Sequence, residues 1–431
     1  MLVSSVAPII TIAIRPEFSI NMRRYLNVIF FMLILVAMEL ATIPLLIWMT
    51  GDSTELKFGS WQLAEWLINY EGGFVRRGLA GQLLYWIGSG SNLISLINLM
   101  TLMLYFCYFI LFITLYRLAK IQNLPIFLLS ILIPGGIFQM GMTAQFFTRK
   151  EILFLMLFGI LCLIYLLTLR KKSKNQSNNH ILLLLVALVG GIFCTFVHEG
   201  YLFMGYPITV ILLWTALKTE PKKSVSGFLF GAYVVLIPLL FIYLSLHKGD
   251  YFLATQIWDS LSLSDRQILS PAAPYSFFGP IASLSWGLTQ HFLTLYGIFA
   301  TGAYIYWPIY IVGNVLVLGF IFYVLSQANP SRATAFFKIL FLAGLCIATM
   351  FFIAADWGRW LSFLTNSLLL FSFALSASAN SEISREGGAS STTAIFSKLY
   401  IKIIFIALIM YSLVFRLPEC CLSPHMIFMS Y

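Results

Sequence analysis

Four short motifs place charged and aromatic side chains next to one another in a chain that is otherwise rich in apolar residues. Each motif combines residue types that can bind an anion or move a proton. Paired arginines present forked donors that match phosphate oxygens, and a histidine beside a carboxylate can act as a general base. The motifs are YEGGFVRRGLAG (70–81), FTRKE (147–151), HEG (198–200) and ADWGRW (355–360).

The first motif holds Arg76 and Arg77 between glycines. Glycine lets a backbone approach a ligand closely, so this segment is a candidate binding site for a phosphate or pyrophosphate group. Glu71 is a candidate catalytic base beside it. The alternative is that both arginines extend to lipid headgroups, as interfacial arginines often do.

A short helix is predicted just upstream of this motif. Gln62, Glu65 and Asn69 recur at helical spacing among apolar residues, and Ser60 is a suitable N-cap. We expect this helix to lie in the membrane interface and to end at the glycine pair 72–73.

The second motif places Arg149 and Lys150 at the expected outer start of a helix, where basic residues are unusual. Both are candidate phosphate ligands. Glu151 suits the helix N-terminus, and the alternative is that it simply neutralises the two cations.

The third motif places His198 and Glu199 in a tight turn between two apolar runs. The pair is a candidate general base or cation ligand, and the alternative is a hydrogen-bonded turn. The spacing of zinc-binding HExxH is absent, so the sequence predicts no metal site of its own.

In the fourth motif Asp356 is a candidate base and Arg359 a candidate phosphate ligand. The two are three residues apart, so the alternative is that they pair with each other on one helical turn. Trp357 and Trp360 suit an interfacial aromatic belt, or the two faces of a sugar ring.

The elements that carry these motifs are predicted from composition and hydropathy. Of 431 residues, 60% are hydrophobic and 10% are charged. A soluble fold could not bury that much apolar surface, and about 20 apolar residues suffice to cross a bilayer as a helix. The sequence predicts an all-α, polytopic bundle of about 11 spans, near 26–49, 93–116, 124–143, 151–169, 180–197, 201–217, 226–246, 303–326, 337–354, 361–378 and 400–416.

The basic residues orient this bundle. With a cytoplasmic N-terminus, 17 of the 26 basic residues lie inside, which agrees with the positive-inside rule. We therefore expect a single integral membrane domain (1–431) with a retained signal-anchor at 26–49, outer loops at 50–92 and 247–301, and a cytoplasmic loop at 379–397. The net charge of +10 is spread between spans without a groove-sized patch, so membrane lipids and not nucleic acid are the expected partners.

Two features could change this topology or its meaning. Residues 277–302 are apolar enough to form a further span, but that span would invert the downstream charge bias. We expect a re-entrant or interfacial segment there. Glu39 lies within the first span, where a carboxylate should face the bundle interior.

The layout resembles membrane glycosyltransferases that use lipid-linked sugars, namely GT-C enzymes and O-antigen or capsule polymerases. The GT-C resemblance lies in acidic residues of the first outer loop near an interfacial helix. Asp52 and Glu55 precede that helix and Glu71 follows it, which departs from a simple match. The polymerase resemblance lies in outer-face arginines, and it implies binding of a polyprenyl diphosphate; those arginines are Arg76, Arg77, Arg149, Arg266 and Arg359.

These observations predict transfer of a sugar or oligosaccharide from a polyprenyl-phosphate donor at the outer face of a bacterial plasma membrane. Arginines would stabilise the phosphate, without or alongside a divalent metal ion, and Glu71, Glu199 with His198, or Asp356 would be the base. A transporter or lipid flippase is the alternative from another class, favoured by Glu39 and the Pro134-Gly135-Gly136 break. An assembly subunit is a third. The sequence leaves donor, acceptor and oligomeric state open.

Overall fold

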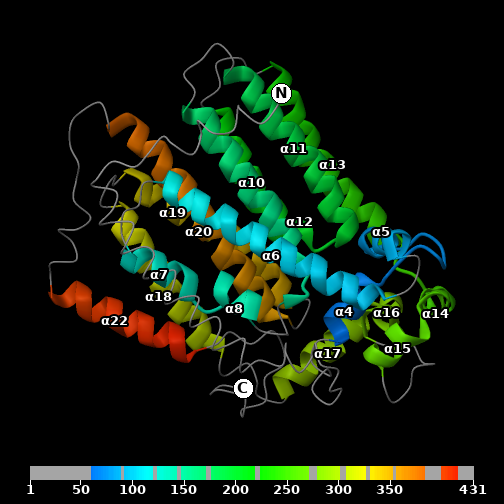
Figure 1. The fold of residues 1–431 in the computed structure, drawn as a ribbon. Helices are drawn as coiled ribbons and strands as arrows, with labels where there is room; N and C mark the ends of the chain where they lie inside the picture. The colour runs from blue at the N-terminus through cyan, green and yellow to red at the C-terminus, as the bar shows by residue number, and fades with distance from the viewer. Residues whose placement is uncertain are drawn as a thin grey trace, which may run out of the picture. The chain divides into compact units, whose positions relative to one another are not determined.

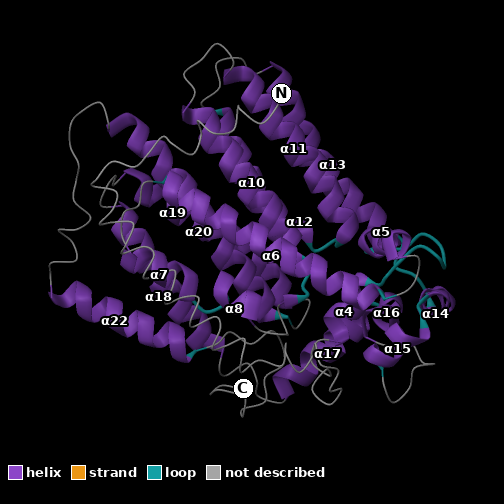
Figure 2. Cartoon of the chain, in the orientation of Figure 1, coloured by secondary structure: helices purple, strands orange, loops and turns teal. Residues whose placement is uncertain are grey.

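The structure, a computed structural model, describes residues 60–88, 92–119, 124–142, 147–170, 176–218, 224–270, 279–300, 307–326, 331–352, 356–383 and 399–415. All of them belong to one compact unit. Within these ranges helices are the only regular secondary structure, as Figure 2 shows. The expected all-α fold class is confirmed for the described residues.

Among the residues that the structure describes, five helices are long and apolar enough to cross a membrane, as is typical of an integral membrane protein. They are α6 (Leu93–Leu118), α10 (Glu151–Arg170), α11 (Gln176–Val197), α13 (Ser224–Leu246) and α18 (Trp307–Ser326). Each matches an expected span to within a few residues. Further helices occupy other expected spans: α12 (Tyr201–Leu217), α19 (Ser331–Ala348) with η4 (Thr349–Phe352), α20 (Trp357–Ile383) and α22 (Leu399–Val414).

The expected span at 124–143 is broken into α7 (Leu124–Leu132) and α8 (Ile137–Met142). The Pro134-Gly135-Gly136 sequence interrupts the helical hydrogen bonds, so carbonyl groups between the two pieces need other partners. Asn314 donates to the carbonyl of Pro134 at 3.0 Å. Ser362 and Asn366 both donate to the carbonyl of Gly135. Side chains of α18 and α20 therefore satisfy the break inside the protein.

Helix α10 lies at the centre of the packing and contacts α6, α11, α12 and α20 (Figure 1). Aromatic side chains fill these contacts: Phe158 of α10 stacks on Phe371 of α20, and Phe154 packs edge-on against Tyr201 of α12. Because α10 and α20 each bring a charged motif at their first residues, this packing brings those two motifs together.

Two segments outside the spans pack against each other beside these helices. Residues 60–88 form α4 (Ser60–Trp66) and α5 (Gly78–Gly88). Residues 247–270 form α14 (Tyr251–Ser260) and α15 (Leu263–Leu269), and residues 279–300 form α16 (Gly279–Ala282), η2 (Ser283–Ser285) and α17 (Leu288–Ala300). Helix α4 contacts both α15 and α16. Asn69 donates to the hydroxyl of Ser260 at 2.9 Å, and buried Asp265 accepts from the backbone N–H groups of Leu93 and Ile94 at the start of α6.

The described part of 277–302 is divided among three short helices, and the longest, α17, has 13 residues. That length covers about 20 Å and does not cross the hydrocarbon. Whether 277–302 is re-entrant or interfacial stays a prediction, because both ends of this segment lie outside the described residues.

The prediction that the upstream helix continues to Gly72 was wrong, because α4 ends at Trp66. The side-chain oxygen of Asn69 accepts from the N–H of Glu71, and that of Gln82 accepts from the N–H of Tyr70. These side chains offer the backbone an alternative to helical hydrogen bonds and form a turn. The expected first span at 26–49, Glu39, Asp52, Glu55 and most of 379–397 lie outside the described residues.

Candidate active site at the helix ends

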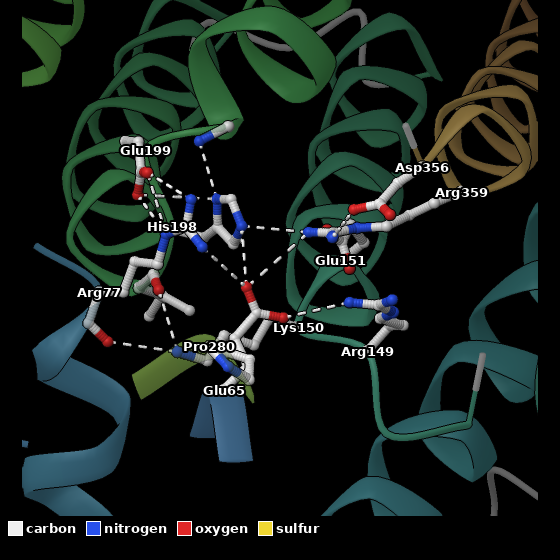
Figure 3. Close-up of polar contacts among 12 residues, drawn as sticks. Glu65, Arg77, Arg149, Lys150, Glu151, His198, Glu199, Pro280, Asp356 and Arg359 are labelled. Atoms are coloured by element: carbon white, nitrogen blue, oxygen red, sulfur yellow. Dashed lines mark hydrogen bonds and ion pairs between the residues drawn. The ribbon is translucent and has the colours of Figure 1, made fainter. Parts of the chain in front are cut away.

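The four motifs meet in the structure, and their side chains contact one another (Figure 3). The first leads into α5, the second ends at the first residue of α10, the third joins α11 to α12, and the fourth enters α20. Helix α4 adds one more carboxylate. We call the resulting set of ion-paired side chains the charge network; it comprises Glu65, Arg76, Arg77, Arg149, Glu151, His198, Glu199, Asp356 and Arg359.

Glu65 is at the centre of the charge network. One of its carboxylate oxygens lies 3.0 Å from Nε2 of His198 and 3.5 Å from Nη1 of Arg77. The other oxygen lies 3.4 Å from Nη1 of Arg149. Nη2 of Arg359 lies 4.0 Å from the first oxygen. Burial alone would raise the pKa of Glu65, but Arg359, His198 and Arg77 hold it well below its usual range. Glu65 therefore stays ionised and contacts residues of all four motifs.

Glu199 forms ion pairs with both arginines of the first motif. Nε of Arg77 donates to both of its carboxylate oxygens at 2.9 Å, and Nη2 adds a 2.6 Å bond. Nη1 of Arg76 lies 3.4 Å away. Burial acts to raise the pKa of Glu199, yet Arg77, His198 and Arg76 lower it. A carboxylate held so strongly in its ionised form is a weak base.

Arg77 adopts a left-handed backbone conformation, with φ of 67°. For a residue other than glycine, this backbone conformation costs roughly 1–3 kcal/mol of folding free energy, and it persists only where surrounding contacts hold the residue in place. Here the guanidinium bonds to Glu199 and the carbonyl accepts from Lys150 at 3.2 Å. The strain is tolerated because both ends of the residue are fixed.

Arg359 links the second and fourth motifs. Its guanidinium pairs with Glu151, and its Nη1 donates to Asp356 at 2.9 Å. The expected pairing of Asp356 with Arg359 is thus confirmed, but it is only part of the contact. Asp356 is the most exposed carboxylate of the network, with 30% of its side chain accessible, whereas Glu65, Glu151 and Glu199 are buried.

The N–H of Gly200 favours one tautomer of the neutral His198 ring. Its Nδ1 accepts from the backbone N–H of Gly200 at 2.9 Å, so the proton of the neutral ring is on Nε2, which faces Glu65. Burial and Arg77 lower the pKa of His198 despite the nearby carboxylates. The expected hydrogen-bonded turn is present through Nδ1. Nε2 faces out of the turn, toward Glu65 and toward Nη2 of Arg359 at 3.1 Å.

Lys150 forms hydrogen bonds with backbone carbonyl groups and does not pair directly with a carboxylate of the charge network. Its fully buried Nζ donates to the carbonyls of Arg77 and Val197, and it lies 5.7 Å from the centre of the Trp66 ring. Burial lowers the pKa of Lys150 to about 8. These contacts join the first motif to the end of α11, so the residue expected to bind phosphate acts as a cross-link.

The cations of the motifs are held by burial or by ion pairs. Arg149, Lys150 and Arg359 are buried. Arg76 and Arg77, for which extension to lipid headgroups was the alternative, are 14% and 20% exposed, and both pair with Glu199. Four arginines face four carboxylates in the charge network, which leaves no net charge there when His198 is neutral. Lys150 beside it contributes one positive charge. Such compensation is what allows charged groups to be buried.

Several expected roles are not supported by position. Glu71 is exposed and accepts from Gln82 at 3.0 Å, outside the charge network. Arg266 pairs instead with Asp259. Trp357 and Trp360, considered as faces for a sugar or as interfacial anchors, are buried against Phe299, Trp307 and Phe351.

The glycines of the first motif permit close approach within the protein. A Cβ at Gly81 would lie 2.0 Å from the carbonyl oxygen of Ile68, and one at Gly72 would lie 2.9 Å from that of Leu253. At these two positions the absence of a side chain allows tight packing against the protein's own backbone, and not the expected approach to a ligand.

The sequence did not indicate the central role of Glu65. For Glu151 it predicted only neutralisation of the adjacent Arg149 and Lys150, whereas Glu151 pairs with Arg359. Gln62, Glu65 and Asn69 were placed on the polar face of an interfacial helix, but all three are buried. The available signal was their common helical face beside a charged motif, which also fits a polar face directed into the protein.

Among the described residues, no group of three or more His, Cys, Asp or Glu side chains is arranged to hold a metal ion. Comparison with known proteins found no matching family model, curated protein or solved structure.

Proposed function

We propose that this protein transfers a sugar or oligosaccharide from a polyprenyl-phosphate-linked donor at the outer face of the membrane. The observation that carries the proposal is the convergence of the four motifs at the ends of α10, α11, α12 and α20. A lipid-linked sugar presents its phosphate and sugar at the membrane surface, so chemistry on it needs charged groups at helix ends and not in mid-membrane.

Solvent accessibility of the carboxylates indicates which residue would act in each step of the reaction. An acceptor hydroxyl oxygen attacks the anomeric carbon of the donor, and the bond from that carbon to the phosphate oxygen breaks. The leaving phosphate keeps the electron pair, and arginine stabilises its charge. The hydroxyl proton passes to a carboxylate, and Asp356 is the best placed of the expected bases because part of its side chain is accessible.

The remaining members then position these groups. Glu65 and His198 hold the arginines in place, and Glu199 orients the fork of Arg77. Fixed dipoles and charges lower a reaction barrier because they need no reorganisation during the reaction. The proposal assigns no residue to a divalent metal.

The setting is proposed as the plasma membrane of a bacterium, with a cytoplasmic N-terminus and about 11 spans. The α4 segment would lie at the outer interface. The 17 basic residues on the cytoplasmic side of that arrangement support it. So does the common location of the four motifs, since alternating spans would bring all of them to one side.

A transporter remains the alternative class, and one observation weighs against it. Broken helices in transporters leave backbone carbonyls free to coordinate ions. Here the carbonyls of Pro134 and Gly135 accept from Asn314, Ser362 and Asn366. The break therefore does not present free carbonyls at these two positions.

The test is surface glycan produced by cells carrying Asp356→Asn, normalised to membrane protein level. Loss of the base should abolish glycan transfer while the folded protein stays abundant. Glu71→Gln is the control, because Glu71 lies outside the charge network. Normal glycan in Asp356→Asn cells, with altered solute uptake or export, would favour the transporter.

A further inference from the structure

The arginines of the charge network differ in how fully their donors are used. Nε and both terminal nitrogens of Arg77 contact carboxylates, and Arg359 contacts Glu151 and Asp356. Arg76 has one contact with Glu199 at 3.4 Å, and its buried Nε has no hydrogen-bond partner. Burial also lowers the pKa of Arg76, against the effect of Glu199. An oxyanion would satisfy these donors.

An exposed aromatic surface begins two residues before Arg76. The ring of Phe74, 40% exposed, stacks on Tyr70 at 5.4 Å and packs against Tyr243 at 5.9 Å and His247 at 5.2 Å. The N–H of Arg76 donates to the carbonyl of His247 at 2.9 Å. The aromatic surface and the arginine are thereby fixed together.

This aromatic surface continues along α13. Leu239, Ile242, Tyr243 and Leu246 recur at the spacing of one helical face, and all four are exposed. Helix α13 is the least buried of the five candidate spans, with 17% of its apolar window covered. Its exposed face leads to Phe74 at the helix end.

We propose that this surface docks the isoprenoid chain of an anionic polyisoprenyl lipid, with its phosphate at Arg76. The chain would lie along the exposed face of α13 and cross the Phe74 ring. The diphosphate would complete the hydrogen bonds of Arg76 and lie beside Glu199 and Arg77. This inference rests on the proposed function and names the part of the donor that each surface recognises.

Charge and shape together select this occupant. A sugar alone would not use the apolar face of α13, and a free phosphate would not use Phe74. An ordinary phospholipid also offers an anion and apolar chains, so displacement by phosphatidylglycerol is the outcome that would reject this occupant. A branched, unsaturated isoprenoid chain offers many CH groups to the ring faces of Phe74 and Tyr243.

The experiment measures binding of farnesyl diphosphate and of inorganic diphosphate to the purified full-length protein in one neutral detergent. Phe74→Ala and Tyr243→Ala should each weaken binding of farnesyl diphosphate by about tenfold and leave that of inorganic diphosphate unchanged. Arg76→Gln should weaken both. Comparison of variants in the same detergent cancels partitioning of the probe into micelles.

Phe228→Ala is the matched control, because Phe228 is an exposed aromatic residue near the other end of α13. It should bind both probes as the unmodified chain does. A thermal unfolding curve for each variant separates loss of binding from loss of fold.

The inference is overturned if Phe228→Ala and Tyr243→Ala have equal effects, or if phosphatidylglycerol displaces farnesyl diphosphate at equal concentration. It is also overturned if Phe74→Ala weakens both probes equally. The proposed function fails separately: selective farnesyl diphosphate binding with normal surface glycan in Asp356→Asn cells would keep the docking surface and reject the sugar transfer.

Discussion

Nε2 of His198 lies 3.0 Å from a carboxylate oxygen of Glu65, although 133 residues separate them in the sequence (198 − 65). Because Nδ1 accepts from the N–H of Gly200, the ring donates to Glu65 from Nε2. Glu65 in turn contacts Arg77 and Arg149. Arg359 lies 4.0 Å from the same carboxylate, so one buried group contacts residues of all four motifs.

Glu65→Gln should destabilise the protein by about 3–5 kcal/mol, because the arginines that it compensates stay buried without their partner. The glutamine amide is nearly equal in size to the carboxylate and preserves the packing, so the lost stability measures the effect of the negative charge. Thermal unfolding in detergent measures it. Glu71→Gln, which changes an exposed carboxylate, should stay within about 0.5 kcal/mol. Equal unfolding temperatures for the two variants would show that Glu65 is not central.

The pH dependence of unfolding should report His198. Its pKa in the folded protein is below the ordinary 6.5, so the unfolded state takes up a proton that the folded state resists. Stability should therefore fall as the pH is lowered from 7 through about 6.5 and below. His198→Gln should flatten this slope between about pH 5 and 6.5, above the range in which carboxylates titrate. An unchanged slope in the variant would assign the dependence to another group.

Gly81→Ala should destabilise the segment that carries the paired arginines, by about 1–3 kcal/mol or more. Its Cβ would lie 2.0 Å from the carbonyl oxygen of Ile68, and backbone cannot move away as a side chain can. Gly227→Ala is the control: nothing lies within 4 Å of its Cβ, and alanine favours the helix. Thermal unfolding should rank Gly227→Ala at or above the unmodified chain and Gly81→Ala clearly below it.

Arg359→Lys should lose most surface glycan even where the protein accumulates normally. The guanidinium contacts Glu151 and Asp356 together, and a lysine ammonium on a flexible stem cannot reproduce that fork. Arg266→Lys is the matched control, because Arg266 forms a pair with the exposed Asp259. Glycan retained in both variants would mean that positive charge alone suffices at position 359.

Much of the fold was predictable from sequence because hydropathy is a local property. A run of about 20 apolar residues forms a helix in lipid whatever its neighbours are, since only a helix satisfies its backbone internally. The predicted spans at 93–116 and 151–169 correspond to α6 and α10 within two residues at each end. The break at Pro134 was also local, because proline and glycine interrupt a helix by their own geometry.

The charge network shows what sequence left undecided. The motifs indicated which residues carry charge, but Arg359 and Glu151 lie 208 positions apart, and no local pattern states that they meet. Lys150 and Arg149 are adjacent in sequence, yet Lys150 bonds to backbone carbonyls and Arg149 to Glu65. The packing of α10 against α20 and the turn at Asn69 decide these partners. Pairing of buried charges depends on distances of a few ångströms, and only the tertiary structure sets those distances.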